Sequence, residues 1–93
     1  MFKKFNWSVL NYTTPQTVEV LPLCNCITVT NYGDSTATVN GKTLFPGTIG
    51  SIAGDSISIG GNENDIFSEK RLTISFSGGT TNNLEIIQKY YLQ

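Results

Sequence analysis

Side chains that could bind a metal ion gather in and near the segment 60–69, which reads GGNENDIFSE. Calcium takes six to eight oxygen ligands from carboxylates, amides and backbone carbonyls. The candidate ligands are Asp55, Asn62, Asn64 and Asp65. The same composition is typical of a solvated loop whose Asn and Asp side chains cap their own turns, and the sequence favours this second interpretation.

The segment also matches part of the calcium-binding nonapeptide Gly-Gly-x-Gly-x-Asp-x-apolar. Gly60, Gly61, Asp65 and Phe67 fit the pattern, whereas Glu63 stands where the third glycine belongs. Sites of that kind need stacked repeats, and the chain has one imperfect copy. We therefore expect no cofactor and keep calcium as a weak alternative.

Catalytic groups are scarce in this chain. It has no histidine, so no Ser-His or Cys-His pair can form. Seven carboxylates leave a two-carboxylate glycosidase site open, but 93 residues offer little room for a substrate cleft. Cys24 and Cys26 would point to the same face of a strand, and with no third cysteine and no histidine they fall short of a zinc site. We predict two small buried thiols, no enzyme activity and no small-molecule substrate.

Charge and hydropathy argue against two classes of partner, nucleic acids and membranes. Six Lys and Arg against seven Asp and Glu give a net charge of −1, and no basic stripe is present. Binding to nucleic acid needs clustered cations that neutralise phosphates, so we expect none. No segment approaches the roughly 20 apolar residues of a membrane helix, and the N-terminus lacks the apolar run of a signal peptide. We expect synthesis in the cytoplasm and no membrane contact.

The elements that would position these residues are strands. Leu72, Ile74 and Phe76 alternate with polar residues, and Asn40-Gly41 is typical of a two-residue type I′ hairpin. Strands are predicted at 17–20, 24–32, 36–39, 42–45, 56–59, 71–76 and 84–92. About seven strands with turn signals at short spacing predict an all-β fold, a small antiparallel β-sandwich of the jelly-roll or Ig-like kind.

The N-terminal residues 1–14 stand apart from the predicted sandwich at 15–93. They are dense in aromatic residues and hold the only Trp. Two interpretations remain open: an edge strand of the same domain, or an arm that docks on a neighbouring subunit. Because interfaces are enriched in Trp, Tyr and Phe, these residues are candidate assembly contacts. The set is Phe2, Phe5, Trp7, Val9, Leu10 and Tyr12.

Four segments occur in a characteristic order: Asn31-x-Gly33, VNGKTLFPG at 39–47, LTISFSGG at 72–79 and LEIIQKYY at 84–91. In this order they resemble small all-β virion proteins of bacteriophages, including tailed phages of Bacteroidetes hosts. Such proteins are capsid-decorating, head-fibre and tail-associated modules, and the resemblance spans about residues 27–91. It implies a non-enzymatic structural protein of the virion whose partners are other virion proteins and copies of itself. It implies no catalytic residues.

A second function remains open. Exposed aromatic side chains beside Asn residues are typical of carbohydrate binding, and this composition fits a β-sandwich module for glycans or a host surface, with or without calcium. The candidate aromatics are Trp7, Tyr32, Phe45, Tyr90 and Tyr91. The same residues also suit a core with few other large side chains.

Overall fold

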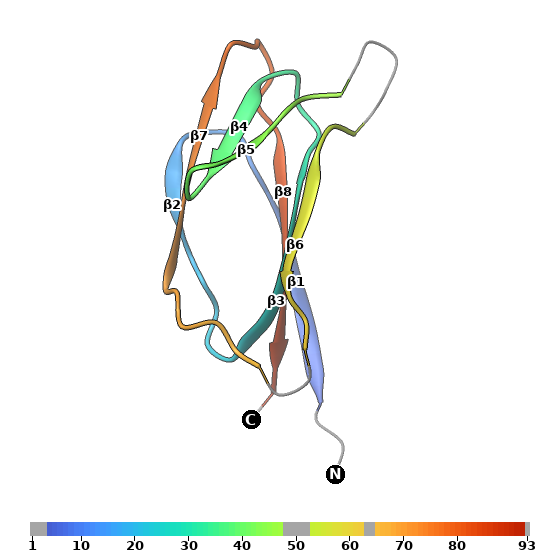
Figure 1. Cartoon of the computed structure of the whole chain (residues 1–93), viewed down its shortest axis with the longest axis vertical. Coiled ribbons are helices and arrows are strands. Elements are labelled where there is room, and N and C mark those ends of the chain that lie inside the picture. The colour runs from blue at the N-terminus through green and yellow to red at the C-terminus, as the bar shows by residue number, and fades with distance from the viewer. Residues whose placement is uncertain (1–3, 48–52, 63–64, 93) are drawn as a thin grey trace.

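A computed structural model describes residues 4–47, 53–62 and 65–92. Those residues form eight β-strands and no helix, so no described helix could cross a membrane (Figure 1). The strands are β1 (Phe5–Tyr12), β2 (Gln16–Glu19), β3 (Cys24–Asn31), β4 (Thr36–Val39), β5 (Lys42–Leu44), β6 (Ser56–Gly60), β7 (Arg71–Ser77) and β8 (Leu84–Tyr91). The sequence predicts about seven strands. The additional strand is β1. It lies in the N-terminal segment 1–14, for which the sequence left two interpretations, an edge strand or an arm.

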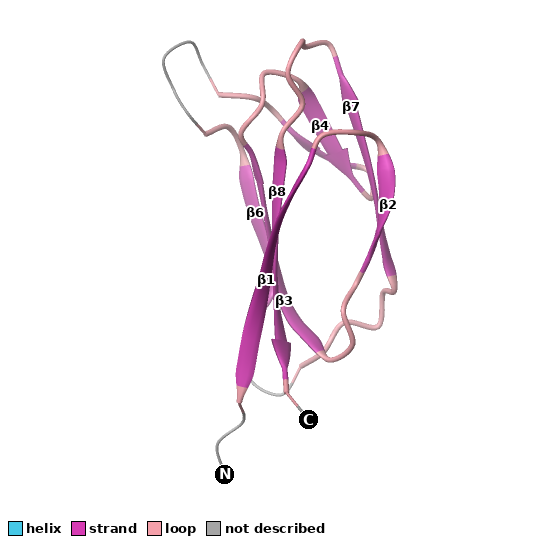
Figure 2. Cartoon of the chain, turned by 180° about the vertical axis from the view of Figure 1, so that it is seen from behind, coloured by secondary structure: helices cyan, strands magenta, loops and turns pink. Residues whose placement is uncertain are grey.

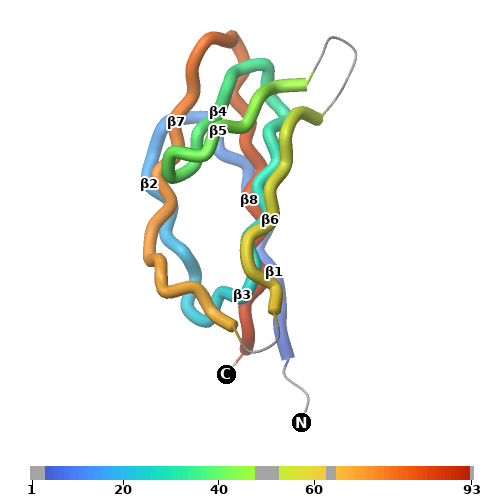
Figure 3. The backbone as a smooth tube through the Cα atoms, viewed as in Figure 1, coloured from blue at the N-terminus to red at the C-terminus, as the bar shows by residue number. Residues whose placement is uncertain are grey.

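The strands make two four-stranded antiparallel sheets. The first sheet has the order β1-β8-β3-β6 and the second has the order β2-β7-β4-β5. Figures 2 and 3 show the two sheets as separate layers that run along the long axis of the molecule, which measures 46 × 25 × 17 Å. The chain passes repeatedly from one sheet to the other, so strands that are distant in sequence become neighbours.

One hydrophobic core joins the two sheets. Along β7 and β8 apolar residues alternate with more exposed ones, as side chains on a strand point to opposite faces in turn. Leu72 and Ile74, which the alternation predicts on one face of a strand, are both buried, and so are Leu84 and Ile86 on one face of β8. The whole buried cluster consists of Val18, Cys24, Ile27, Val29, Ala37, Val39, Leu44, Leu72, Ile74, Leu84 and Ile86.

The β4–β5 hairpin has the predicted type of turn. Asn40 and Gly41 have φ angles of 48° and 84°, and Val39 pairs with Lys42 across the turn. Positive φ at both central residues is the requirement of a type I′ turn, whose twist matches that of the flanking strands. The sequence also predicts a type II turn at Pro46-Gly47, where proline sets φ and glycine can supply positive φ, and a β-bulge near Ile49. Both extend into residues 48–52, outside the described part.

The predicted burial of Cys24 is confirmed, but Cys26 is not buried and the predicted common face of the two cysteines is wrong. Cys24 pairs with Tyr90 while Cys26 pairs with Lys89, so β3 has one extra residue, Asn25, between them. This β-bulge reverses the alternation: Cys24 lies in the core at 1% exposure, whereas Cys26 is only half-buried. The two side chains therefore do not share a face.

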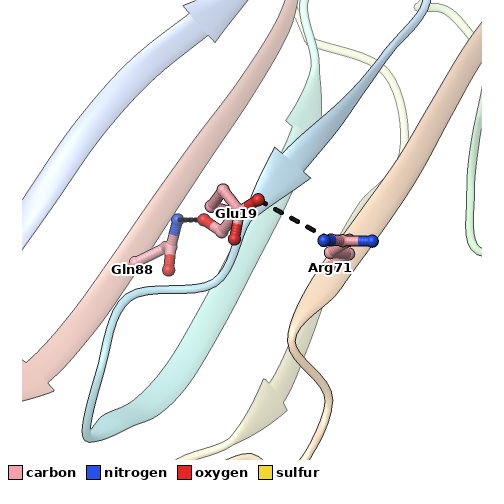
Figure 4. Close-up of polar contacts among 3 residues, drawn as sticks. All are labelled: Glu19, Arg71 and Gln88. Carbon is pink, nitrogen blue, oxygen red and sulfur yellow. Dashed lines mark hydrogen bonds and ion pairs between the residues drawn. The ribbon is translucent and has the colours of Figure 1, made fainter.

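Buried amides connect segments that the sheet ladders do not join. Gln88 on β8 donates from Nε2 to the carbonyl of Glu19 (3.2 Å), and its Oε1 accepts from the amide of Leu21 (2.8 Å). Figure 4 shows Gln88 reaching Glu19 across the two sheets, beside the ion pair of Glu19 with Arg71 at 3.6 Å. That ion pair is exposed and contributes little to stability. The buried amide is the stronger link between sheets, because buried polar groups must be paired.

Candidate assembly surface

Strand β1 forms one edge of the first sheet. It pairs with β8 from Phe5 opposite Tyr91 to Tyr12 opposite Leu84 without a break in register. Within the described ranges no strand pairs with its other side (Figure 2). An edge strand presents a row of backbone groups that can pair with another strand.

The register shows which backbone groups these are. The amide of Leu92 donates to the carbonyl of Lys4 (2.9 Å), so these two residues form a hydrogen-bonded pair. Hydrogen-bonded and non-hydrogen-bonded pairs alternate along an antiparallel ladder. The even-numbered residues of β1 therefore bond to β8, and the odd-numbered residues direct their N–H and C=O groups away from it. The outward set is Phe5, Trp7, Val9 and Asn11.

The same strand carries exposed apolar side chains. Phe5, Trp7, Val9 and Leu10 are 46%, 60%, 47% and 53% exposed, and we call these four residues the β1 edge patch. Leu10 pairs with buried Ile86, which places even positions on the face toward the core and odd positions on the outer face. Three of the four patch residues therefore lie on the outer face of the first sheet.

Two contacts organise the outer part of the patch. The ring centroids of Phe5 and Trp7 lie 6.3 Å apart with the planes tilted by 40°. Lys89, which is opposite Trp7 in the ladder, places Nζ 4.3 Å from the centroid of the Phe5 ring. An ammonium group at this distance is attracted to the negative face of the ring. The Phe5 ring is therefore held between Trp7 and the Lys89 ammonium group on the outer face of the sheet.

The two edges of the second sheet are better protected than β1. Natural sheets protect an edge with a short strand, a charge or a proline. Strand β2 has four residues, follows Pro15 and contains Glu19; strand β5 has three residues and begins with Lys42. Strand β1 has eight residues and contains neither a proline nor a Lys, Arg, Asp or Glu. Strand β6, the other edge of the first sheet, also lacks a charge and a proline but has five residues, so β1 is the longest of the four edges.

The outer face of the second sheet has a different character. Its strands direct hydroxyl groups outward, and the side chains of Thr38 and Ser75 hydrogen bond across β4 and β7. The residues concerned are Thr17, Thr36, Thr38, Thr43, Thr73, Ser75 and Ser77. In the described part of the chain, this face has no apolar row like that of β1.

The structure brings together most of the predicted assembly residues. Phe5, Trp7, Val9 and Leu10 lie on one exposed strand. Tyr12 is different, because it is only partly exposed and packs against the core, where burial raises its pKa. Phe2 lies outside the described residues.

The predicted calcium ligands are not brought together. Asp55 precedes β6 and accepts a hydrogen bond from the amide of Phe45 at Oδ2 (3.0 Å), whereas Asn62 and Asp65 follow β6. The five residues of β6 rise about 3.3 Å each, so roughly 17 Å separates its ends. One ion cannot be shared across that length, and Asn64 lies outside the described residues. Of the residues described, no three of the types His, Cys, Asp and Glu are grouped to hold a metal.

Asn25, which the sequence does not mark as a functional or structural position, holds the loop after β6. The Asn25 side chain is 1% exposed and donates from Nδ2 to the carbonyls of Asn62 and Asp65, both at 2.8 Å. Its Oδ1 has no protein partner, and a hollow of about 210 Å³ beside it is lined in part by Ile66 and Phe67. An amide between two cysteines gave no signal, because only the bulge turns it inward.

The candidate sugar-binding aromatics are scattered. Trp7 and Tyr91 share the outer face of the first sheet, but Phe45 follows β5 in the second sheet and Tyr32 follows β3. Tyr90 and Tyr91 are partly buried on β8. Trp7 has the ring of Phe5 beside it.

At one end of the molecule, Asp34 joins two loops. Its Oδ1 accepts from the amides of Thr80 (2.8 Å) and Thr81 (2.6 Å), and its Oδ2 accepts from the Thr80 hydroxyl (2.8 Å). The Thr81 amide and then the Thr80 hydroxyl hold the pKa of this carboxyl below its usual value. Gly33 fits beside them, because a Cβ there would collide with the Thr81 carbonyl. This carboxylate is therefore committed to a structural role.

Comparisons with protein-family models, with curated proteins and with solved structures found no match for this chain. Its function is therefore inferred from its own residues, of which the β1 edge patch is the clearest exposed feature.

Proposed function

We propose that this chain is a non-enzymatic structural component of a bacteriophage virion, a capsid-decorating, head-fibre or tail-associated subunit that acts through protein–protein assembly. The observation that carries the proposal is β1: eight residues of edge strand with outward backbone groups and an exposed apolar patch. Exposed aromatic and aliphatic residues in one row are typical of interaction sites. Its partners are other virion proteins and copies of itself.

The strand order supports a jelly roll as the fold. A jelly roll has eight strands in two four-stranded sheets, with the first and last strands adjacent in one sheet, and the order β1-β8-β3-β6 with β2-β7-β4-β5 agrees with this. Jelly rolls are frequent among viral capsid and lectin domains. A fold does not define a function, so the assignment to a virion rests on the sequence resemblance and on the assembly surface together.

Mass spectrometry of purified particles tests the proposal. Particles from cultures that produce this chain should contain it in many copies. A triple variant, Phe5→Ser, Trp7→Ser and Val9→Thr, should fold but be depleted from particles. A matched variant on the polar outer face, Thr36→Val and Thr73→Val, should be incorporated normally. Absence of the wild-type chain from the particles would refute the virion assignment, and normal incorporation of the triple variant would refute the role of β1.

A second candidate function uses the same patch. The 60% exposed Trp7 ring stands beside Phe5 on a sheet face, and such a pair can stack against a sugar ring. Binding to a glycan array that is lost in Trp7→Ala and kept in Phe45→Ala would support glycan binding. Melting with calcium and with EDTA adds an independent test, since a ligand that binds only the native state raises Tm. No retention on the array and no shift in Tm would leave assembly as the function.

A further inference from the structure

We propose that β1 pairs antiparallel with β1 of a second copy, about a two-fold axis beside Ser8, so that two first sheets become one continuous eight-stranded sheet. This inference rests on the proposed function of β1 in assembly and names its partner as the chain itself. Strand addition at a sheet edge gains affinity from main-chain hydrogen bonds and specificity from alternate side chains. The edge of β1 offers both: unpaired backbone N–H and C=O groups for the hydrogen bonds, and exposed apolar side chains for the specificity.

The backbone geometry selects one register. The outward residues are Phe5, Trp7, Val9 and Asn11, and they become the hydrogen-bonded pairs of the new ladder. All four find partners within β1 when Phe5 pairs with Asn11 and Trp7 pairs with Val9 of the second copy, which gives about eight hydrogen bonds. A shift of two residues either way leaves one outward residue of each copy without a partner in the strand. Ser8 then lies opposite Ser8 at the axis.

The side chains agree with this register. Trp7 and Val9 are both on the outer face, so pairing them keeps the outer faces of the two copies on the same side. The apolar row Phe5, Trp7 and Val9 of one copy then continues into the row of the other. Like charges opposite each other are destabilising in sheets, and β1 has no Lys, Arg, Asp or Glu to oppose its copy.

The Trp7 amide needs one local change. It is capped by Oδ1 of Asn6 at 3.0 Å, and both residues are exposed. Because the cap comes from the neighbouring side chain, rotation of Asn6 frees this donor without disturbing the ladder to β8. In the monomer, the Asn6 side chain therefore satisfies the Trp7 N–H while no second copy is present.

The new backbone ladder supplies the main contacts of this interface. A large aromatic side chain carries roughly 150–250 Å², so the exposed parts of the β1 edge patch amount to on the order of 400 Å² per copy. Edge pairing buries only the parts of these side chains that face the second copy, because the outer face of the joined sheet stays open to solvent. Strand β1 also offers the longest edge: β6 has five residues, β2 has four and β5 has three.

A disulfide trap tests this register. In a background with Cys26→Ser, the variant Ser8→Cys places two thiols in a non-hydrogen-bonded pair, where Cα atoms are about 4.5 Å apart and a disulfide can form. Cys24 is buried and serves as an inert residue. The control Asn6→Cys is also on β1, but its thiol would be four residues away from its copy, roughly 13 Å along the strand. Mild oxidation should convert Ser8→Cys to a covalent dimer at least tenfold faster than Asn6→Cys. Equal rates would refute the register.

Sedimentation of the unmodified chain over a concentration series tests self-pairing as such, and a chain that stays monomeric throughout would overturn it. The variant Val9→Pro removes an outward N–H and leaves the ladder to β8 intact, as edge strands tolerate proline on their free side. It should lower the dimer fraction at least tenfold.

If the wild-type chain is monomeric but Val9→Pro still abolishes incorporation into particles, the partner of β1 is another virion protein. The second-copy inference then fails while the proposed function stands. If Val9→Pro has neither effect, both fail.

Discussion

Two buried Asn side chains in β3 hold other segments of the chain in place by hydrogen bonds to backbone carbonyls. Asn25 and Asn31 lie near the two ends of β3, and both are buried. Asn25 donates to two carbonyls of the loop after β6, and Asn31 donates to the carbonyls of Ser35 in the following loop and of Leu44 on β5. Asn31 also accepts from the Gly33 amide at 3.0 Å. These bonds fix where the loops leave the sheet, which a small domain needs because its core is limited.

The Asn25 clamp can be tested by substitution. Asn25→Ala removes the donors to Asn62 and Asp65 and leaves their carbonyls unpaired, so we expect the free energy of unfolding to fall by about 1–3 kcal/mol. The matched control is Gln16→Ala, whose amide bonds the Thr14 carbonyl in an exposed position and should cost less than about 0.5 kcal/mol. Urea unfolding measures both. Equal effects of the two variants would contradict a structural role for Asn25.

Asp34 predicts a dependence on pH. Its pKa is lower in the folded state than the ordinary 3.8 because the Thr81 amide and the Thr80 hydroxyl stabilise the carboxylate. A carboxyl with a depressed folded pKa contributes stability that is present above its unfolded pKa and is lost as the pH falls through its folded pKa. Wild type should therefore melt at a higher temperature than Asp34→Asn at pH 6, and the difference should shrink below pH 4. A difference in Tm that is constant from pH 6 to pH 2.5 would contradict this role.

At the scale of elements, the alternation of apolar and polar residues predicted the strands well, except at the β-bulge in β3. Leu72 and Ile74 share a buried face of β7, as the alternation predicts, because a strand with one buried face repeats every two residues. The bulge at Asn25 adds one residue to β3 and moves Cys24 to the core face. Nothing in the sequence marks this position, since a bulge is fixed by the register with a distant strand.

Thiol labelling measures the bulge directly. Cys24 is buried and burial raises its pKa, so it should resist alkylation in the native protein, whereas the half-buried Cys26 should react. We expect one labelled thiol per chain in buffer, on Cys26, and two in urea. Peptide mapping identifies the site, and the variant Cys26→Ser should label only when unfolded. Equal labelling of both cysteines in the native state would contradict the bulge.

At the scale of the whole molecule, the arrangement of strands was beyond prediction from sequence. Two antiparallel sheets of a β-sandwich were expected, but the pairing of β1 with β8 joins the first strand to the last. That pairing turns the aromatic N-terminal segment into a sheet edge, and it places Phe5, Trp7 and Val9 together on the outer face. The same topology separates Asp55 from Asn62, which are near in sequence but have the strand β6 between them.

Sedimentation velocity of charge variants tests most directly the proposal that β1 is the assembly surface of this protein. Val9→Lys places a charge in the β1 edge patch, and Thr17→Lys places the same charge on the outer face of another edge strand, β2. We predict that the wild-type chain and Thr17→Lys form dimers or larger species as concentration rises, and that Val9→Lys remains a folded monomer. A wild-type chain that associates together with a Val9→Lys variant that associates equally well would contradict the proposal.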